Sequence, residues 1–399
     1  MSTLKVDAIR HNSATSDAIT TASDGTCTAK LTSIGGGGLS HRNIVINGAF
    51  RIAQRATSST STGYATVDRF QVSGSGADEN PTSSQHTLTS SDTGPWEEGF
   101  RYSYHIQNGN QTGGAGASDY VQPETRLEAQ DLANCGWNYT SSSSYITLSF
   151  WVKSSVAGDY TLNFGTQDGT GYRYLMEYTL AANTWTKITK TIPGNSNLTV
   201  NNDNGHGATI MWYPFLGSSF IQADQENNWY ASSNQKYGTV STTNWWTTND
   251  ATWEMTGVQL EVGDTATSFE HRSYGEELMR CMRYYEKQSV DDGNGGYATV
   301  CMGYRANSTR VVIQPVFRVP KRATNADFQF NGPMRLYYQN NSSEQVIDSW
   351  TTFQNSQFGL YGGYKVLDRS GGVGGSDGYT FRMEGNGNTS AYIAFSSEL

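Results

Sequence analysis

Apolar and polar residues alternate over several short stretches of this chain. In residues 145–154 (YITLSFWVKS) every second side chain is apolar, and the same period of two recurs over 160–164 and, more weakly, over 184–192. Residues 44–46 (IVI) form a shorter apolar run before an Asn-Gly pair. A period of two predicts antiparallel strands with one face on a core, and an Asn-Gly pair predicts a tight turn.

The alternation changes phase within residues 253–262. Trp253 and Met255 occupy odd positions, whereas Val258 and Leu260 occupy even ones, and Gly257 lies at the switch. A β-bulge absorbs one extra residue in this way and favours glycine. The sequence therefore predicts a bulged, curved strand.

One helix is predicted after this strand. Ser273 and Glu276 have the spacing of a capping box. The apolar residues that follow recur at helical spacing, at Leu278, Cys281, Met282 and Tyr285. We expect a helix that continues to about Lys287, and we assign residues 273–288 to a bridging helix between two domains.

Beyond the helix the pattern is again that of strands. Alternating stretches over 297–305 and 310–319 predict a hairpin, and further strands are expected over 379–383 and 391–395. Pro315 lacks an N–H, so the strand that contains it should be an edge strand or a bulged one. Residues 289–399 are thus expected to form a smaller C-terminal β-domain.

The first 38 residues have a different character. Residues 1–34 are rich in Ser, Thr and Ala, and Gly35 to Gly38 form a glycine run. They contain too little apolar surface to build a core alone. We expect residues 1–38 to be an attachment segment and linker, ordered against partners or frayed.

Composition narrows the classes of function. Charged residues make up 16% of the chain and aromatic residues 12%, with a net charge of −9. Ordered, β-rich domains fit this combination better than disorder does, because disordered segments are poor in aromatic residues. The negative charge argues against nucleic-acid binding, and no apolar run reaches the ~18 residues of a membrane span. The opening residues also lack the apolar core of a signal peptide, so folding in a cytoplasm is expected.

Sequence motifs for a zinc site and for a phosphate-binding loop are missing, since there is no HExxH and no glycine-rich loop that ends in Gly-Lys. Pairs of acids such as Glu97 and Glu98 occur by chance in a chain with 36 of them. Residues 291–295 resemble a calcium loop but lack its later glutamate, so a hairpin turn is expected. We therefore expect a protein that is not an enzyme and needs no cofactor or metal.

Aromatic residues crowd into residues 212–253, within sequence rich in Asn, Gln and Thr. Rings beside amides suit sugars, because CH faces stack on the ring while amides bond the hydroxyl groups. Burial in a core or a subunit interface is the alternative, and we assign Trp253 to the core. The candidates for glycan binding are Trp229, Tyr230, Trp245 and Trp246.

Three stretches together resemble a known family: 43–70 (NIVINGAFRIAQRATSSTSTGYATVDRF), 145–164 and 257–287 (GVQLEVGDTATSFEHRSYGEELMRCMRYYEK). They are similar to the carbohydrate-binding-module-like jelly roll of tail fibre proteins from tailed bacteriophages, particularly marine ones. Residues 2–20 are similar to the N-terminal segment of such fibres. The resemblance covers about residues 1–290.

The resemblance implies a fold, a location and partners. The chain would be all-β, with a jelly-roll β-sandwich over 39–272, the bridging helix and the C-terminal β-domain. It would be a virion tail fibre protein and a homotrimer, joined to other tail proteins through residues 1–38 and attached to a host cell-surface glycan. The alternatives are a purely structural virion component, such as a head decoration or tail collar, and a polysaccharide depolymerase.

Overall fold

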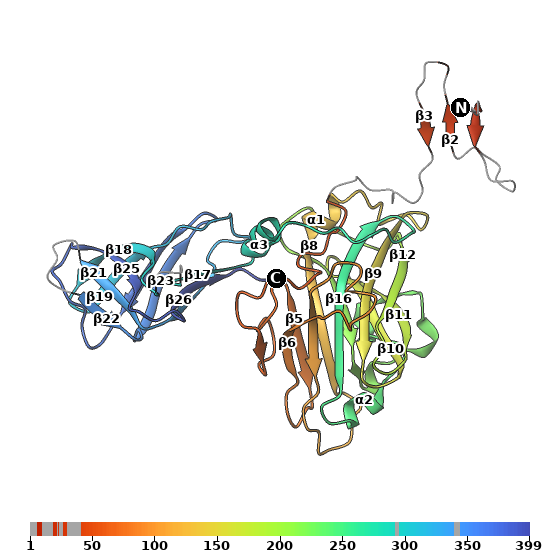
Figure 1. Ribbon diagram of the computed structural model, residues 1–399, viewed down its shortest axis with the longest axis horizontal. Coiled ribbons are helices and arrows are strands. Elements are labelled where there is room, and N and C mark those ends of the chain that lie inside the picture. The colour runs from red at the N-terminus through yellow and green to blue at the C-terminus, as the bar shows by residue number, and fades with distance from the viewer. Residues whose placement is uncertain are drawn as a thin grey trace.

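The computed structural model describes residues 6–9, 19–21, 23, 27–29, 41–291, 295–338 and 344–399. The chain is all-β: a β-sandwich is followed by one bridging helix and a smaller C-terminal β-domain (Figure 1). The predicted glycine linker at 35–38 lies outside the described residues, as do residues 292–294 of the predicted hairpin turn.

The described elements fall into three groups. The N-terminal segment holds β1 (Ala8–Ile9), β2 (Ile19–Thr21) and β3 (Cys27–Ala29). The sandwich holds β4 (Ser58–Ser59), β5 (Phe70–Ser75), β6 (Thr82–Thr87), β7 (Tyr102–Gln107), β8 (Tyr120–Glu128), α1 (Ala129–Ala133), β9 (Tyr145–Ser154), β10 (Gly158–Thr166), β11 (Tyr172–Leu180), β12 (Thr186–Pro193), β13 (His206–Tyr213), β14 (Phe215–Leu216), β15 (Trp229–Ala231), α2 (Thr243–Thr247) and β16 (Thr252–Val262). The rest holds α3 (Tyr274–Met282), β17 (Tyr285–Ser289), β18 (Thr299–Asn307), β19 (Arg310–Gln314), β20 (Asp327–Asn331), β21 (Met334–Tyr338), β22 (Glu344–Ile347), β23 (Thr352–Phe358), β24 (Gly363–Asp368), β25 (Thr380–Gly385) and β26 (Tyr392–Ser396).

Two antiparallel sheets face each other in the sandwich. One has the strand order β14-β8-β13-β10-β11-β15, with β5 also paired to β8, and the other has the order β12-β9-β16-β7-β6-β4. The strands predicted over 145–154, 160–164 and 184–192 are confirmed as β9, β10 and β12. Their apolar faces point inward and, with Trp212 and Trp253, form one continuous core.

The predicted bulge is confirmed in β16. The pairing of β16 with β9 shifts register between Thr256 and Gln259, and Gly257 has a φ of +65°. A Cβ at Gly257 would lie 2.6 Å from Phe100 Cζ, so both the backbone and the packing require glycine there.

Residues 44–46 do not form the predicted strand. Residue 44 has no regular secondary structure and residues 45–46 lie in a bend. The side chain of Asn43 makes hydrogen bonds to β16 of the kind that backbone groups make between paired strands. Its Nδ2 donates to Val258 O at 3.0 Å, while its Oδ1 accepts from Leu260 N at 3.1 Å. The segment is therefore joined to β16 by the Asn43 amide together with two separate backbone hydrogen bonds, from Ile44 N to Leu260 O and from Val258 N to Gly48 O, both 2.9 Å long. These bonds do not amount to a regular backbone ladder.

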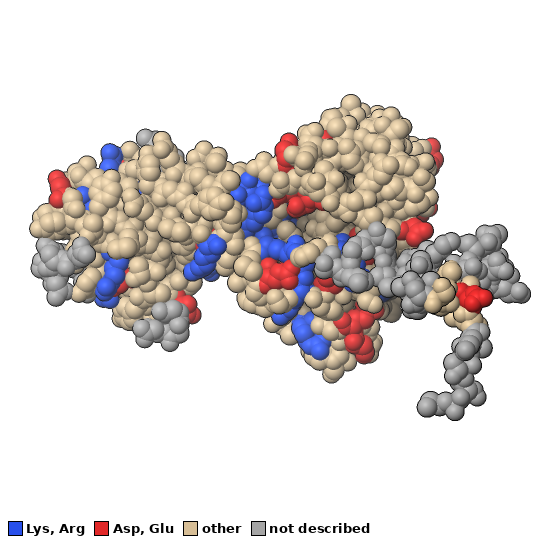
Figure 2. All heavy atoms as spheres, turned by 90° about the horizontal axis from the view of Figure 1, so that it is seen from above, with Lys and Arg blue, Asp and Glu red and all other residues tan. Residues whose placement is uncertain are grey.

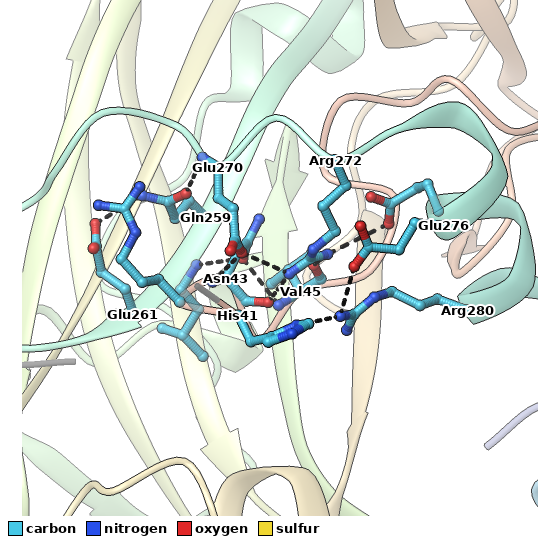
Figure 3. Close-up of polar contacts among 12 residues, drawn as sticks. His41, Asn43, Val45, Gln259, Glu261, Glu270, Arg272, Glu276 and Arg280 are labelled. Carbon is cyan, nitrogen blue, oxygen red and sulfur yellow. Dashed lines mark hydrogen bonds and ion pairs between the residues drawn. The ribbon is translucent and has the colours of Figure 1, made fainter. Parts of the chain in front are cut away.

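Arg272 lies at the centre of the same polar network (Figure 3). Its guanidinium donates to Val45 O at 3.1 Å and to Asn43 O, and pairs with Glu270 at 3.0 Å. Glu270 in turn accepts from Asn43 N at 2.9 Å. These bonds join the segment before β5, the end of β16 and the start of α3.

Helix α3 is shorter than predicted. Ser273 caps it by accepting from Glu276 N at 3.3 Å, as the sequence indicated, but it ends at Met282 and not near Lys287. Residues 285–289 form β17 instead, because they pair with β26. Tertiary pairing thus overrides the helical spacing of Tyr285.

The C-terminal β-domain packs two sheets around its own core. One has the order β22-β21-β25-β18-β19-β24-β23, and the other has the order β17-β26-β20. The predicted hairpin over 297–305 and 310–319 is present as β18 and β19, but β19 ends at Gln314 and lies between β18 and β24. Pro315 therefore directly follows the last residue of an interior strand. The prediction that Pro315 lies in an edge strand or a bulged strand is wrong.

Buried ion pairs join the two domains. Figure 2 shows Lys and Arg side chains gathered at the waist between them. Arg69 pairs with Glu398 and lies 3.4 Å from the centre of the Tyr284 ring, while Arg55 pairs with Glu398 at 3.1 Å. Arg283 pairs with the buried Glu128 at 2.7 Å. Charge pairing between segments far apart in sequence therefore fixes the junction.

We expect Glu398→Gln to lower the free energy of unfolding by roughly 3–5 kcal/mol, because it leaves the Arg69 cation buried without its carboxylate. The double variant Arg69→Met with Glu398→Gln should lose less, since no unpaired cation remains. Urea unfolding followed by tryptophan fluorescence measures both.

The control is Glu276→Gln, which breaks a partly exposed pair with Arg280 and should cost under about 1 kcal/mol. A single Glu398→Gln variant as stable as this control would contradict the role assigned to the junction.

Candidate functional site

Trp245 and Trp246 do not form an exposed sugar platform, so their prediction as glycan-binding residues is wrong. Their exposed fractions are 0% and 1%, because α2 turns both rings into one end of the sandwich core. The Trp246 ring lies 4.7 Å from that of Phe215, and Asn108 Nδ2 donates to the carbonyls of both tryptophans. Trp253 is confirmed as a core residue.

Trp229 and Tyr230 are half-buried in the edge strand β15 and lie on opposite faces. Trp229 packs against the core, and its indole N–H donates to Pro193 O at 2.9 Å. Tyr230 pairs in register with Arg173 of β11, so both side chains lie on the outer face of the sheet. Of the four predicted residues, Tyr230 alone lies on the face described next.

A groove of about 460 Å³ lies on the outer face of the sheet formed by β5, β8, β13, β10 and β11. Strand residues form its floor and the loops after β14 and β15 form its rim. The lining residues are Gln71, Ser73, Tyr120, Gln122, Glu124, Arg126, Arg173, Met211, Tyr213, Leu216, Phe220 and Tyr237.

The polar floor comes from the pairing of β5 with β8. Gln71 stands opposite Glu124 and Ser73 opposite Gln122, so these side chains share one face. Glu124 is buried, and its two oxygens accept from the amides of Gln71 and Gln122 and from Arg126 Nε at 2.9 Å. The carboxylate thereby fixes the positions of the two amides. Their carbonyl oxygens accept no hydrogen bond from the described residues, so they can accept those of a ligand.

Aromatic rings form the other side of the groove. The Phe220 ring lies 6.0 Å from Tyr120 and 5.2 Å from Tyr237, both edge to face. Tyr213 lies beneath them, and burial raises the pKa of its phenol. Tyr237 supports the guanidinium of Arg173 at 4.4 Å from its ring centre.

Sequence reasoning missed this groove. A signal was present in residues 120–127 (YVQPETRL), where polar or amphipathic residues alternate with residues that face the core. That pattern predicts a strand with one polar face. It does not show that β5, β13 and β11 belong to the same sheet, because those pairings form only in the folded protein.

The other features found in the described residues are less specific. A larger, more open cavity of about 770 Å³ near α2 is lined mainly by small side chains and no aromatic ring. Glu98 bonds Trp151 and pairs with Lys187 at 2.8 Å, as a surface contact. The described residues include no cluster of three or more potential metal ligands. No helix in the described ranges is long and apolar enough to cross a membrane.

No protein-family model matches the sequence, and neither does any curated protein. Among solved structures, the chain is similar to the enzymatically active domain of tailspike protein 4 of bacteriophage CBA120, with a TM-score of 0.30 and 12% identity over 55% of this chain and 21% of that one. It is similar to a CBM4 protein (TM-score 0.27, 10% identity, 54% of this chain and 97% of that one).

A third similar structure is the family 11 carbohydrate-binding module of Clostridium thermocellum with a mixed-linked tetrasaccharide. Its TM-score is 0.23 and its identity 13%, over 51% of this chain and 91% of that one. With TM-scores this low, the three partial likenesses say nothing about what this chain binds.

His206, at the start of β13, should make the folding stability depend on pH. Its Nε2 lies 2.6 Å from the Thr209 hydroxyl, and burial and the positive charges of Arg126, Arg69 and Arg322 lower its pKa to about 4. Between pH 6.5 and 4 the unfolded chain binds the proton more readily, so folding stability falls as pH falls. His206→Gln should abolish a loss of roughly 2–3 kcal/mol by pH 4, measured by urea unfolding at each pH.

His86→Gln is the control of opposite sign, because the hydrogen bond with Glu254 raises the pKa of His86. That variant should lose more stability on acidification than the parent. Superimposable pH profiles for His206→Gln and the parent would contradict the assignment.

Proposed function

We propose that this chain is a non-catalytic glycan-binding protein of a phage tail fibre, which attaches the particle to a host cell surface. The groove on the outer face of the β5–β8–β13–β10–β11 sheet carries the proposal. It brings amides, guanidinium groups and aromatic rings to one surface, which is the mixture that sugar hydroxyl groups and CH faces require.

The chemistry of the groove favours binding over hydrolysis. Glycoside hydrolysis uses two carboxylates that flank the scissile bond. Glu124 is the single carboxylate among the residues that line the groove, and its oxygens already accept from Gln71, Gln122 and Arg126. We therefore propose a receptor-binding role without cleavage.

The placement in a virion rests on the sequence resemblance at 2–20, 43–70 and 257–287. We propose that residues 1–38 attach the chain to other tail proteins and that the protein is a homotrimer. A trimer would carry three copies of the site, which would compensate for weak binding at each one. Once one site is bound, the linked sites meet the surface at a high effective concentration, and the overall affinity rises.

A purely structural virion role is the second candidate. Large apolar side chains are exposed in the C-terminal domain, including Met302, Val316 and Tyr361. Apolar residues of this kind suit contacts between subunits. In that case the groove variants below would leave attachment to cells unchanged.

We expect the double variant Gln71→Ala with Gln122→Ala to weaken binding to host cells and to an immobilised host glycan by about tenfold or more, because two hydrogen-bonding groups leave the groove. Retention on a glycan array and whole-cell pull-down measure the loss. Thr189→Ala, an exposed position on the opposite sheet, is the matched control and should bind normally. Equal binding by both variants would reject the groove as the receptor site.

We expect the purified protein to have the mass of three chains by light scattering at micromolar concentration. Association that buries exposed apolar area in the C-terminal domain provides the physical reason. A mass of one chain under these conditions would reject the trimer and the avidity argument.

A further inference from the structure

Arg173 is a nearly buried cation that lines the groove. It lies on β11 opposite Gly165 of β10, and its exposed fraction is 9%. The absence of a side chain at Gly165 leaves room for it: a Cβ there would lie 3.2 Å from Arg173 Cγ. The guanidinium is thus held within the sheet face by its neighbours.

The Arg173 guanidinium has no carboxylate partner among the described residues. Its Nη1 donates to Ser232 O at 3.2 Å, and its buried Nε has no hydrogen-bond partner in the part of the chain that the structure describes. Two other buried arginines behave differently, since Arg69 pairs with Glu398 and Arg272 pairs with Glu270. Because a desolvated cation without a counter-charge is costly, this arrangement favours an anion supplied from outside the protein.

The charges around the groove point the same way. Arg126 pairs with Glu124 at 2.9 Å, which leaves Arg173 as the unmatched charge among the lining residues. The chain as a whole carries a net charge of −9. Distant acids are screened beyond the ~8 Å Debye length at physiological salt, so the local cation determines what the groove attracts.

We propose that the groove binds an acidic saccharide and that Arg173 pairs with its carboxylate, an inference that rests on the proposed glycan-binding function. A guanidinium matches a carboxylate better than an ammonium group does, because it can donate two parallel hydrogen bonds. The amides of Gln71 and Gln122 and the hydroxyl of Ser73 then bond the sugar hydroxyl groups. Tyr237, which stacks on the guanidinium, fixes its orientation.

Affinity electrophoresis of the full chain tests this inference. The probes are alginate, polygalacturonate, hyaluronate and polysialic acid, each compared with its carboxyl-reduced, neutral counterpart. We expect at least one acidic polymer to retard the protein and its reduced form to do so about tenfold less. Arg173→Gln should remove this preference, and Arg173→Lys should retain part of it. Arg101→Gln, which removes an arginine stacked on Trp96 outside the groove, is the matched control.

The outcomes distinguish a failure of the acidic-saccharide inference from a failure of the proposed glycan binding. Equal retardation by acidic and reduced polymers, unchanged in Arg173→Gln, overturns the inference and leaves glycan binding intact. Retardation by no polymer, acidic or neutral, rejects both. If Arg173→Gln does not fold, the parent protein still decides: raising the salt concentration should weaken retardation by the acidic polymer, and retardation that is insensitive to salt overturns the inference.

Discussion

The buried amide of Asn43 and the guanidinium of Arg272 form the contact on which the rest of the structure depends. Asn43 bonds the backbone of β16 at Val258, within the bulge, and at Leu260, just after it, and Arg272 bonds the carbonyls of Asn43 and Val45 (Figure 3). Buried polar groups must be paired, so neither residue can be replaced by an apolar one without leaving backbone groups unsatisfied. This network sets the path of the chain into α3, and hence the position of the second domain.

Few residues are charged, and several of them form buried ion pairs, in which losing one partner would leave an unpaired charge away from water. Lys321 and Glu286 form a pair at 2.6 Å with no exposed side-chain area, and Arg69 and Arg55 share Glu398 at the domain junction. In each case the cation and anion come from distant segments. Arg173 departs from this rule, and it does so on the surface best suited to a ligand. Among the residues that line the groove, Arg173 therefore says most about the charge of the ligand.

The aromatic residues serve mainly the core. A sandwich of this size needs large rings to fill the space between two sheets, and Trp212, Trp245, Trp246 and Trp253 are all fully buried. The outer face instead carries amides, arginines and a small aromatic rim. The polar residues of the floor stand on strands, so strand register would fix the positions of their hydrogen bonds to a ligand. Strands hold side chains more rigidly than loops do.

The sequence alone determined the elements whose signals are local. The period of two predicted β9, β10 and β12, the change of phase at Gly257 predicted the bulge, and Ser273 with Glu276 predicted the start of α3. Tertiary structure alone decided which rings are exposed, where α3 ends and which polar residues meet in the groove. The reason is physical: burial and register depend on strands such as β5 and β8, or β17 and β26, that lie far apart in the chain and pair only in the folded protein.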